Sequence, residues 1–172
     1  MEESFVTIFY IFISALILKG ALYMVKQKNA VIIERLGKFN KVSKAGLHIK
    51  IPLIDSISGK INLRVRELPV EVETKTKDDV FVKIVVSVQF YVIDSIDGIR
   101  DSFYELNNPE QQIQSYVFDS IRSEVPLMEL DDVFAQKEKI AIAIKNELSD
   151  TMKQFGFDFI KALVTDIDPD AK

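Results

Sequence analysis

The sequence contains no cysteine and only one histidine, His48. Without cysteine the chain cannot form disulfides, thiolate metal sites, a cysteine nucleophile or an S-palmitoyl anchor. Glu2 occupies the position where N-myristoylation needs glycine, so that lipid anchor is excluded as well. A single histidine leaves no basis for a multi-histidine zinc site or for most acid–base relays. We therefore expect no catalytic residues, no metal and no cofactor.

Motifs for phosphate binding, dinucleotide binding and serine hydrolysis are also missing. Asp166, Asp168 and Asp170 imitate the start of a calcium loop, but Ala171 stands where that loop needs glycine. A membrane-bound hydrolase, or its regulatory subunit, is the alternative class of function. A hydrolase needs a nucleophile activated by a base, and this chain offers serines with one distant histidine.

Positive charge is scarce overall, since 22 basic residues face 26 acidic ones and the net charge is −4. This balance argues against nucleic-acid binding. The basic residues are concentrated, however: residues 19–60 carry a net charge of +7, whereas residues 61–172 carry −9. Basic residues beside a membrane anchor attract anionic lipid headgroups. The predicted headgroup contacts are Lys19, Lys26, Lys28, Arg35, Lys38, Lys41 and Lys44.

One hydrophobic run stands out, Phe5 to Leu18, which has no charged residue. Extended through Lys19 to Val25, it would form a helix of about 31 Å, close to the ~30 Å hydrocarbon core of a bilayer. We predict a transmembrane anchor over residues 1–25, with the domain that follows on the cytoplasmic side because the basic residues come after the helix. The residues predicted to lie in the membrane are Phe5, Ile8, Phe9, Ile11, Phe12, Ile13, Leu16, Ile17, Leu18 and Leu22.

Two other interpretations of this run remain. A cleaved signal peptide needs a basic start and a small-residue cleavage site, and a buried core helix needs a polar stripe or caps. The run shows neither set of features. A span is favoured over an intramembrane hairpin because no proline interrupts the segment.

A period of two, typical of strands, begins at Asn29. We expect strands around residues 30–33, 47–51, 61–65 and 70–73, with a turn at Ser58-Gly59. The clearest strand is Val80–Val92, where every second residue is apolar. Residues 26–68 are predicted to form a basic, strand-rich subdomain next to the membrane, and residues 69–172 a second subdomain.

Helices follow in the second subdomain. Asn108 and Pro109 favour a helix start, and a second, longer helix is expected from Leu130 to a stop at Gly156. Residues 157–167 return to strand character. Strands, then two helices, then a strand is an α+β pattern.

Several stretches resemble the stomatin/prohibitin/flotillin (SPFH, band-7) family. Residues 34–39, 45–47 and 51–55 are similar to the family's opening motif, with Ala45 in place of the usual proline. Residues 74–93, 116–122, 130–134 and 164–169 resemble its later strands and helices. Within the family, the helical half is most similar to stomatin-like and hypersensitive-induced reaction proteins.

The resemblance implies a non-enzymatic scaffold that organises lipid microdomains or membrane protein complexes and modulates a membrane protease or ion channel. It also implies membrane binding through the first half of the domain and assembly into large homo-oligomers. The family's coiled coil, which follows the motif at Asp168-Pro169, is not in this sequence, so we expect small oligomers from these residues alone. Residues 51–54 are interpreted either as a shallow membrane contact or as a strand end packed in the core.

Overall fold

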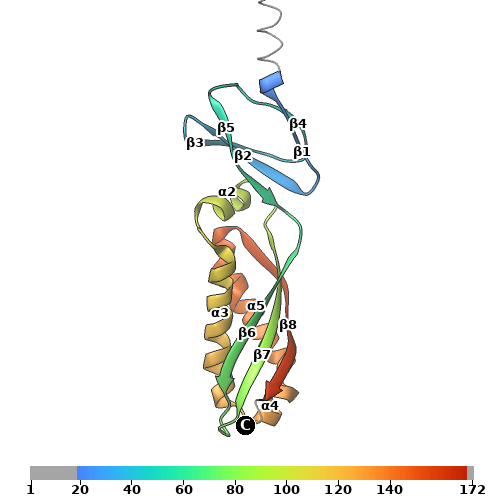
Figure 1. The fold of residues 1–172 in the computed structure, drawn as a ribbon, viewed down its shortest axis with the longest axis vertical. Coiled ribbons are helices and arrows are strands. Elements are labelled where there is room, and N and C mark those ends of the chain that lie inside the picture. The colour runs from blue at the N-terminus through green and yellow to red at the C-terminus, as the bar shows by residue number, and fades with distance from the viewer. Residues whose placement is uncertain (1–18, 170–172) are drawn as a thin grey trace, which may run out of the picture. The chain divides into compact units, whose positions relative to one another are not determined.

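The computed structural model describes residues 19–169 (Figure 1). The chain divides into two compact units, and the division lies between Leu63 and Arg64. The boundary expected near Leu68-Pro69 instead falls inside a strand. Each unit has its own sheets, and the two are described separately.

The first unit is built from five short strands in two antiparallel sheets. One sheet has the order β3-β2-β5 and the other pairs β1 with β4. The residues of β2 form the centre of its core, since Ala30, Ile32 and Ile33 are fully buried. The bounds of the strands are Leu22–Val25 (β1), Asn29–Arg35 (β2), Lys38–Ser43 (β3), Gly46–Ile49 (β4) and Asp55–Asn62 (β5).

β5 contains a β-bulge where the sequence predicted a turn. Ile32 of β2 lies opposite Gly59 while Ile33 lies opposite Ile57, so Ser58 is the extra residue. A serine–glycine pair is typical of both turns and bulges, because glycine adopts the backbone conformations that both require. The predicted turn at Ser58-Gly59 is therefore wrong, and the strand continues through it.

The first residues described are helical, but only from Lys19 to Ala21. Leu22–Val25 then form strand β1, so the predicted extension of the anchor helix to Val25 is wrong. Antiparallel pairing with β4 supplies the backbone hydrogen bonds that a helix would otherwise provide. No helix within residues 19–169 is long and apolar enough to cross a membrane.

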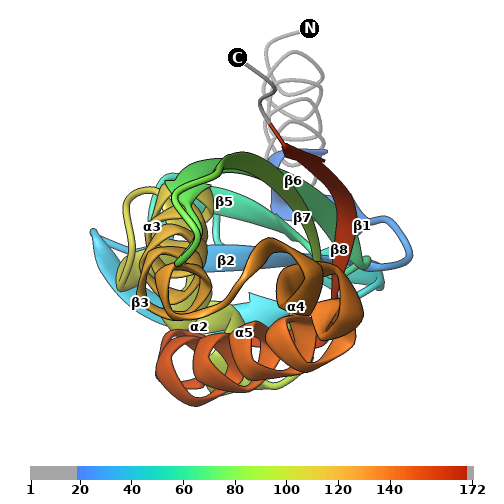
Figure 2. The same cartoon turned by 90° about the horizontal axis from the view of Figure 1, so that it is seen from below.

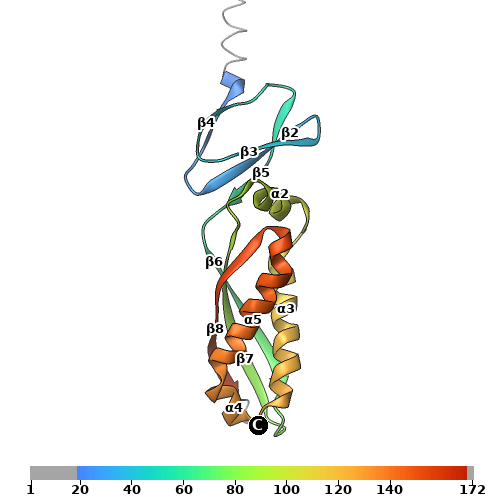
Figure 3. The ribbon, with the colours of Figure 1, turned by 180° about the vertical axis from the view of Figure 1, so that it is seen from behind.

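The second unit is a three-stranded antiparallel sheet in the order β6-β7-β8. Its strands are Arg66–Lys75 (β6), Phe81–Val92 (β7) and Phe157–Pro169 (β8). The even-numbered residues of β7 from Val82 to Val92 are all buried, which confirms the predicted alternation. Helices α3 and α5 cover that face of the sheet (Figures 2 and 3).

Two helices of this unit have side-chain caps at their first turn. The Oδ1 atom of Asn108 accepts a hydrogen bond from the backbone N–H of Gln111, and Pro109 is the first helical residue of α3, as predicted. Ser95 caps α2 in the same way. The bounds are Ile96–Tyr104 (α2), Pro109–Glu124 (α3), Leu130–Ala135 (α4) and Lys137–Met152 (α5), with 3-10 turns at Val125–Leu127 and Lys153–Phe155.

The helical part differs from the expectation in two respects. The helix predicted from Leu130 is broken at Gln136 into α4 and α5, and α2 was not predicted. Gly156 ends the last turn with a φ of +80°, which agrees with its predicted role as a stop. With the final strand β8 in place, the α+β pattern of antiparallel strands, helices and a last strand is confirmed.

Candidate membrane-contact surface

Four apolar side chains project from one face of the β1–β4 pair. Leu22 lies opposite Ile49, and Met24 lies opposite Leu47. Directly opposed residues, and residues two apart along a strand, point to the same side of a sheet. The side chains of Met24, Leu47 and Ile49 are 77%, 69% and 67% exposed. We call these four residues, Leu22, Met24, Leu47 and Ile49, the apolar face.

The opposite face of the same strand pair is packed against the protein. Val25 is buried in a cluster with Val31 and Ile33, and Tyr23 packs on that cluster. The ring of Tyr23 stacks on His48, with ring centroids 5.6 Å apart. The Tyr23 hydroxyl also forms a hydrogen bond with Ser43, at 2.6 Å. This packing fixes the strand pair, so the apolar face is held outward.

The turn after β4 adds a second group of exposed apolar residues. Leu53 is fully exposed at its tip and has a φ of +71°, an uncommon conformation for a residue with a side chain. Ile51 and Ile54 are 45% and 41% exposed. The interpretation of residues 51–54 as a strand end packed in the core is therefore wrong, and their interpretation as a shallow membrane contact stays a prediction.

Asp55 holds this turn in place. Its carboxylate accepts hydrogen bonds from Arg35 Nε at 2.8 Å and from the backbone N–H of Ile51 at 2.9 Å. The backbone N–H of Leu36 donates to the carbonyl oxygen of Ile54, which attaches the turn to the end of β2. The hydrogen bond from Arg35, followed by that from Ile51, lowers the pKa of Asp55 to about 2. The carboxylate is thus charged, and bonded to the turn, at any physiological pH.

One lysine side chain, that of Lys41, lies beside these apolar groups, and the backbone of two further lysines is held close to them. Lys41 donates from Nζ to the carbonyl oxygen of Ile49 at 3.1 Å, which brings it beside β4. His48 Nε2 is hydrogen-bonded to the carbonyl oxygen of Lys44 at 2.6 Å. The backbone N–H of Lys50 donates to Ala21, at the end of the described helical turn. Apolar side chains bordered by lysines are the combination that favours an anionic bilayer surface.

Comparison with known proteins places the chain in a family. The model of the SPFH domain / Band 7 family matches residues 23–172. This chain belongs to the SPFH domain / Band 7 family. Members of the SPFH family are membrane-associated, oligomeric scaffolds, and the resemblance drawn from the motifs is confirmed.

Three relatives illustrate the match to SPFH proteins. Hypersensitive-induced response protein 4 of Arabidopsis thaliana is 40% identical over 147 residues, covering 85% of this chain and 50% of that protein. An uncharacterised protein of Methanocaldococcus jannaschii is 30% identical over 159 residues, covering 91% of this chain and 77% of its own length. Human stomatin-like protein 2, mitochondrial, is 26% identical over 145 residues, covering 83% of this chain and 39% of that protein. The chain thus spans about half the length of the Arabidopsis relative.

The structure of this SPFH domain shows that the predicted headgroup residues lie in different surroundings. The guanidinium of Arg35 forms an ion pair with Asp55, so it holds the turn at residues 51–54 in place. Lys26 and Lys28 lie in the turn between β1 and β2, directly after the strand that carries Leu22 and Met24, whereas Lys38 begins β3. Of the residues predicted to lie in the membrane, Phe5 to Leu18 fall outside the described residues, and Leu22 belongs to the apolar face.

Sequence reasoning missed most of the apolar face. The alternation of Leu47, Ile49 and Ile51 was recognised, but an apolar strand face was assumed to be buried. Met24 was assigned to a helix. No local signal identified this face, because it forms only when β1 pairs with β4, which lies more than twenty residues further along the chain. Of the three aspartates that imitate a calcium loop, Asp166 and Asp168 lie along β8, and Asp170 lies outside the described residues. Residues 19–169 hold no group of potential metal ligands.

Proposed function

We propose that this chain is a membrane-anchored scaffold that organises lipid microdomains or membrane protein complexes, and that through those complexes it modulates a membrane protease or channel. The observation that carries the proposal is the apolar face, which lies on a rigid strand pair and is joined by the exposed turn at Leu53. Membership of a family of membrane-associated scaffolds supports it.

The proposed geometry has two levels of attachment. The run from Phe5 to Leu18, continued by the helical residues Lys19–Ala21, anchors the chain as a single short span of about 17 residues, at the lower end of the length that crosses a bilayer. Residues 26–172 lie on the cytoplasmic side. The apolar face and Leu53 then enter the headgroup region of the same leaflet, while the lysines contact anionic lipid. Burying a leucine or methionine side chain is worth about 1.5–3 kcal/mol when it is complete. Partial insertion of several such side chains therefore gives measurable binding even without the span.

A chain lacking residues 1–18 separates these two levels. We expect it to sediment with vesicles of phosphatidylcholine and phosphatidylserine, and to bind less to phosphatidylcholine alone because the lysines lose their partners. A Leu47→Asn/Leu53→Asn variant should bind at least ~10-fold more weakly, equivalent to about 1.4 kcal/mol. Leu127→Ser is the matched control, because Leu127 is 73% exposed but belongs to the second unit.

Equal binding by the Leu47/Leu53 variant and by the control would rule out the apolar face as a membrane contact. The proposed orientation has its own test. Protease added to sealed, right-side-out cells should leave residues 26–172 intact, whereas digestion would place the domain on the other side.

Self-association belongs to the proposal as well. Family members are oligomeric, and we propose that the full-length form of this protein is a homo-oligomer. Light scattering coupled to size exclusion measures the assembly directly, and a strictly monomeric full-length protein would contradict it.

A further inference from the structure

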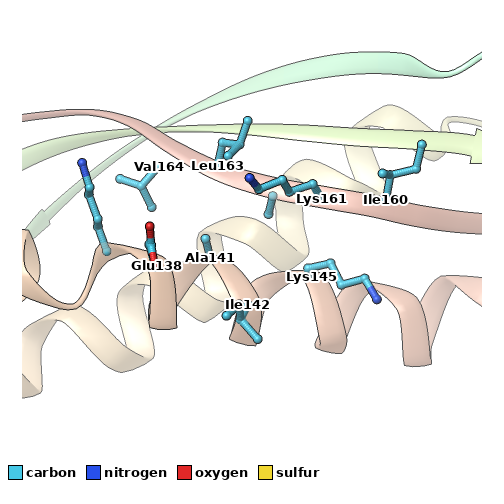
Figure 4. A pocket seen from close by; sticks show the side chains of 10 residues that line it. Glu138, Ala141, Ile142, Lys145, Ile160, Lys161, Leu163 and Val164 are labelled. Atoms are coloured by element: carbon cyan, nitrogen blue, oxygen red, sulfur yellow. The ribbon is translucent and has the colours of Figure 1, made fainter.

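The second unit contains a groove that is separate from the apolar face. It has a volume of about 440 Å³ and lies between α5 and β8. Figure 4 shows side chains of β8 along one wall and side chains of α5 along the other. All its lining residues lie between Lys137 and Val164, so the membrane-contact surface contributes nothing to it.

One wall of the groove is the open edge of a sheet. β8 pairs with β7 on one side only. Between two bulges, at Ile160 and Thr165, the four residues Lys161–Val164 keep a regular register with β7. Regular antiparallel residues turn alternate backbone N–H and C=O groups away from their partner strand. The edge therefore offers unpaired donors and acceptors along the groove.

The groove combines an apolar surface with positive charge. Ile142 and Ile160 are 61% and 51% exposed, although both are large apolar side chains. Lys137, Lys145 and Lys161 also line the groove, against one carboxylate, Glu138. Within residues 19–169 none of these three lysines forms an ion pair. The groove is thus a locally positive site on a unit whose net charge is −9.

We propose that this groove binds a short extended segment of a partner protein in which acidic and apolar residues alternate. Its main chain adds to the edge at Lys161–Val164, as extended peptides do at other sheet edges. Side chains two positions apart in a strand lie about 7 Å apart on one face. Alternate side chains of the added strand point to opposite faces of the sheet. The apolar positions of such a segment face α5 and contact Ile142, and its carboxylates lie on the face of Lys161, which is opposite Gln89. Lys137 and Lys145 on α5 add positive charge to the same groove.

Two other occupants fit the groove less well. A small anionic amphiphile would satisfy the lysines and the isoleucines but leave the backbone edge unpaired. A second copy of this chain offers β6, the acidic edge strand of the same sheet. Pro69 interrupts that edge, however, and Glu67 and Glu71 are already bonded to Ser87 and Lys83. The partner segment uses every feature of the groove.

A synthetic hexapeptide alternating glutamate and valine, labelled with fluorescein, provides the test with the full chain in nanodiscs. We expect saturable binding by anisotropy, and slower hydrogen exchange at Lys161–Val164. A Lys145→Glu/Lys161→Glu variant should bind at least ~10-fold more weakly, whereas Lys139→Glu, on α5 but outside the groove, should bind within about 2-fold of the original chain. A hexapeptide alternating lysine and valine should not bind.

The same peptide with N-methylated amides keeps its charge and apolar groups but cannot pair with a strand. Binding by this peptide equal to that of the parent would show that the groove takes an anionic amphiphile, and the proposal would fail. It would also fail if the parent peptide did not bind, or if the chain self-associated through a contact that Lys145→Glu/Lys161→Glu abolished. None of these results bears on vesicle binding, which depends on the other unit.

Discussion

Replacing Gly156 by alanine tests how tightly α2 is packed on the end of α5. A Cβ atom at this position would lie 2.0 Å from the carbonyl oxygen of Gly98 in α2, far inside any tolerable contact. Gly156 also has a φ of +80°, where a side chain costs about 1–2 kcal/mol. Since the clash is with backbone, α2 must move away, and Ile99, which is fully buried, loses part of its packing.

The expected loss is the sum of these two effects. Exposing much of a buried isoleucine costs about 1.5–3 kcal/mol, so Gly156→Ala should lower the free energy of unfolding of the second unit by about 2.5–5 kcal/mol. Gly37→Ala is a matched control, because Gly37 has a φ of +78° and a Cβ atom added there would meet nothing within 4 Å. It should lower the stability of the first unit by only about 1–2 kcal/mol.

Hydrogen exchange read by mass spectrometry reports the two units separately. Peptides from α2 and the start of β8 report the loss of stability in Gly156→Ala. Peptides from β2 and β3 report the loss in Gly37→Ala. Equal losses in the two variants would show that the approach of Gly98 to Gly156 adds nothing, and the packing argument would be wrong.

Three further predictions concern local features of the fold. Asn108→Ala should lower the free energy of unfolding by about 1 kcal/mol in urea denaturation because the α3 cap is lost, while Asn108→Asp keeps it. Ile144→Ala should cost about 2–5 kcal/mol, since Ile144 is 1% exposed, whereas Ile142→Ala on the same helix should change stability by less than about 0.5 kcal/mol. The pKa of Asp55 is lowered to about 2 from an ordinary value of 3.8, so its stabilisation is complete above pH 3.8 and is lost as the pH falls towards 2. Hydrogen exchange across that range should show the loss of stability in the first unit. Asp55→Asn should remove this pH dependence. If the pH dependence were the same in Asp55→Asn as in the original chain, the Arg35–Asp55 pair would not be its cause.

Elements with a long, regular pattern could be predicted from the sequence. The alternation of β7 extends over the whole strand, so its buried face followed directly from a period of two. The start of α3 was predictable because the cap at Asn108 is made by residues close in the chain. Both depend on local signals, which is why no knowledge of the rest of the fold was needed.

Elements determined by distant contacts were not predictable in the same way. Gly156 was predicted as a helix stop, but the sequence gives no sign that its backbone lies against Gly98 of α2, where a Cβ atom on Gly156 would come within 2.0 Å of the Gly98 carbonyl oxygen. Leu22–Val25 continue a hydrophobic run in the sequence, yet their partner β4 lies more than twenty residues further along. The same limit applied to the candidate site, because the apolar face exists only once those two strands are paired.

The order of the strands has a consequence for synthesis of the protein. β6 and β7 are neighbours in the chain and can form a hairpin as soon as both are made, but β8, the other partner of β7, ends at Pro169. At 5–20 residues per second, translation from the end of β7 to the end of β8 takes about 4–15 s. Throughout that interval one edge of β7 remains unpaired on the ribosome. A chaperone that protects nascent chains therefore has its longest opportunity between these two strands.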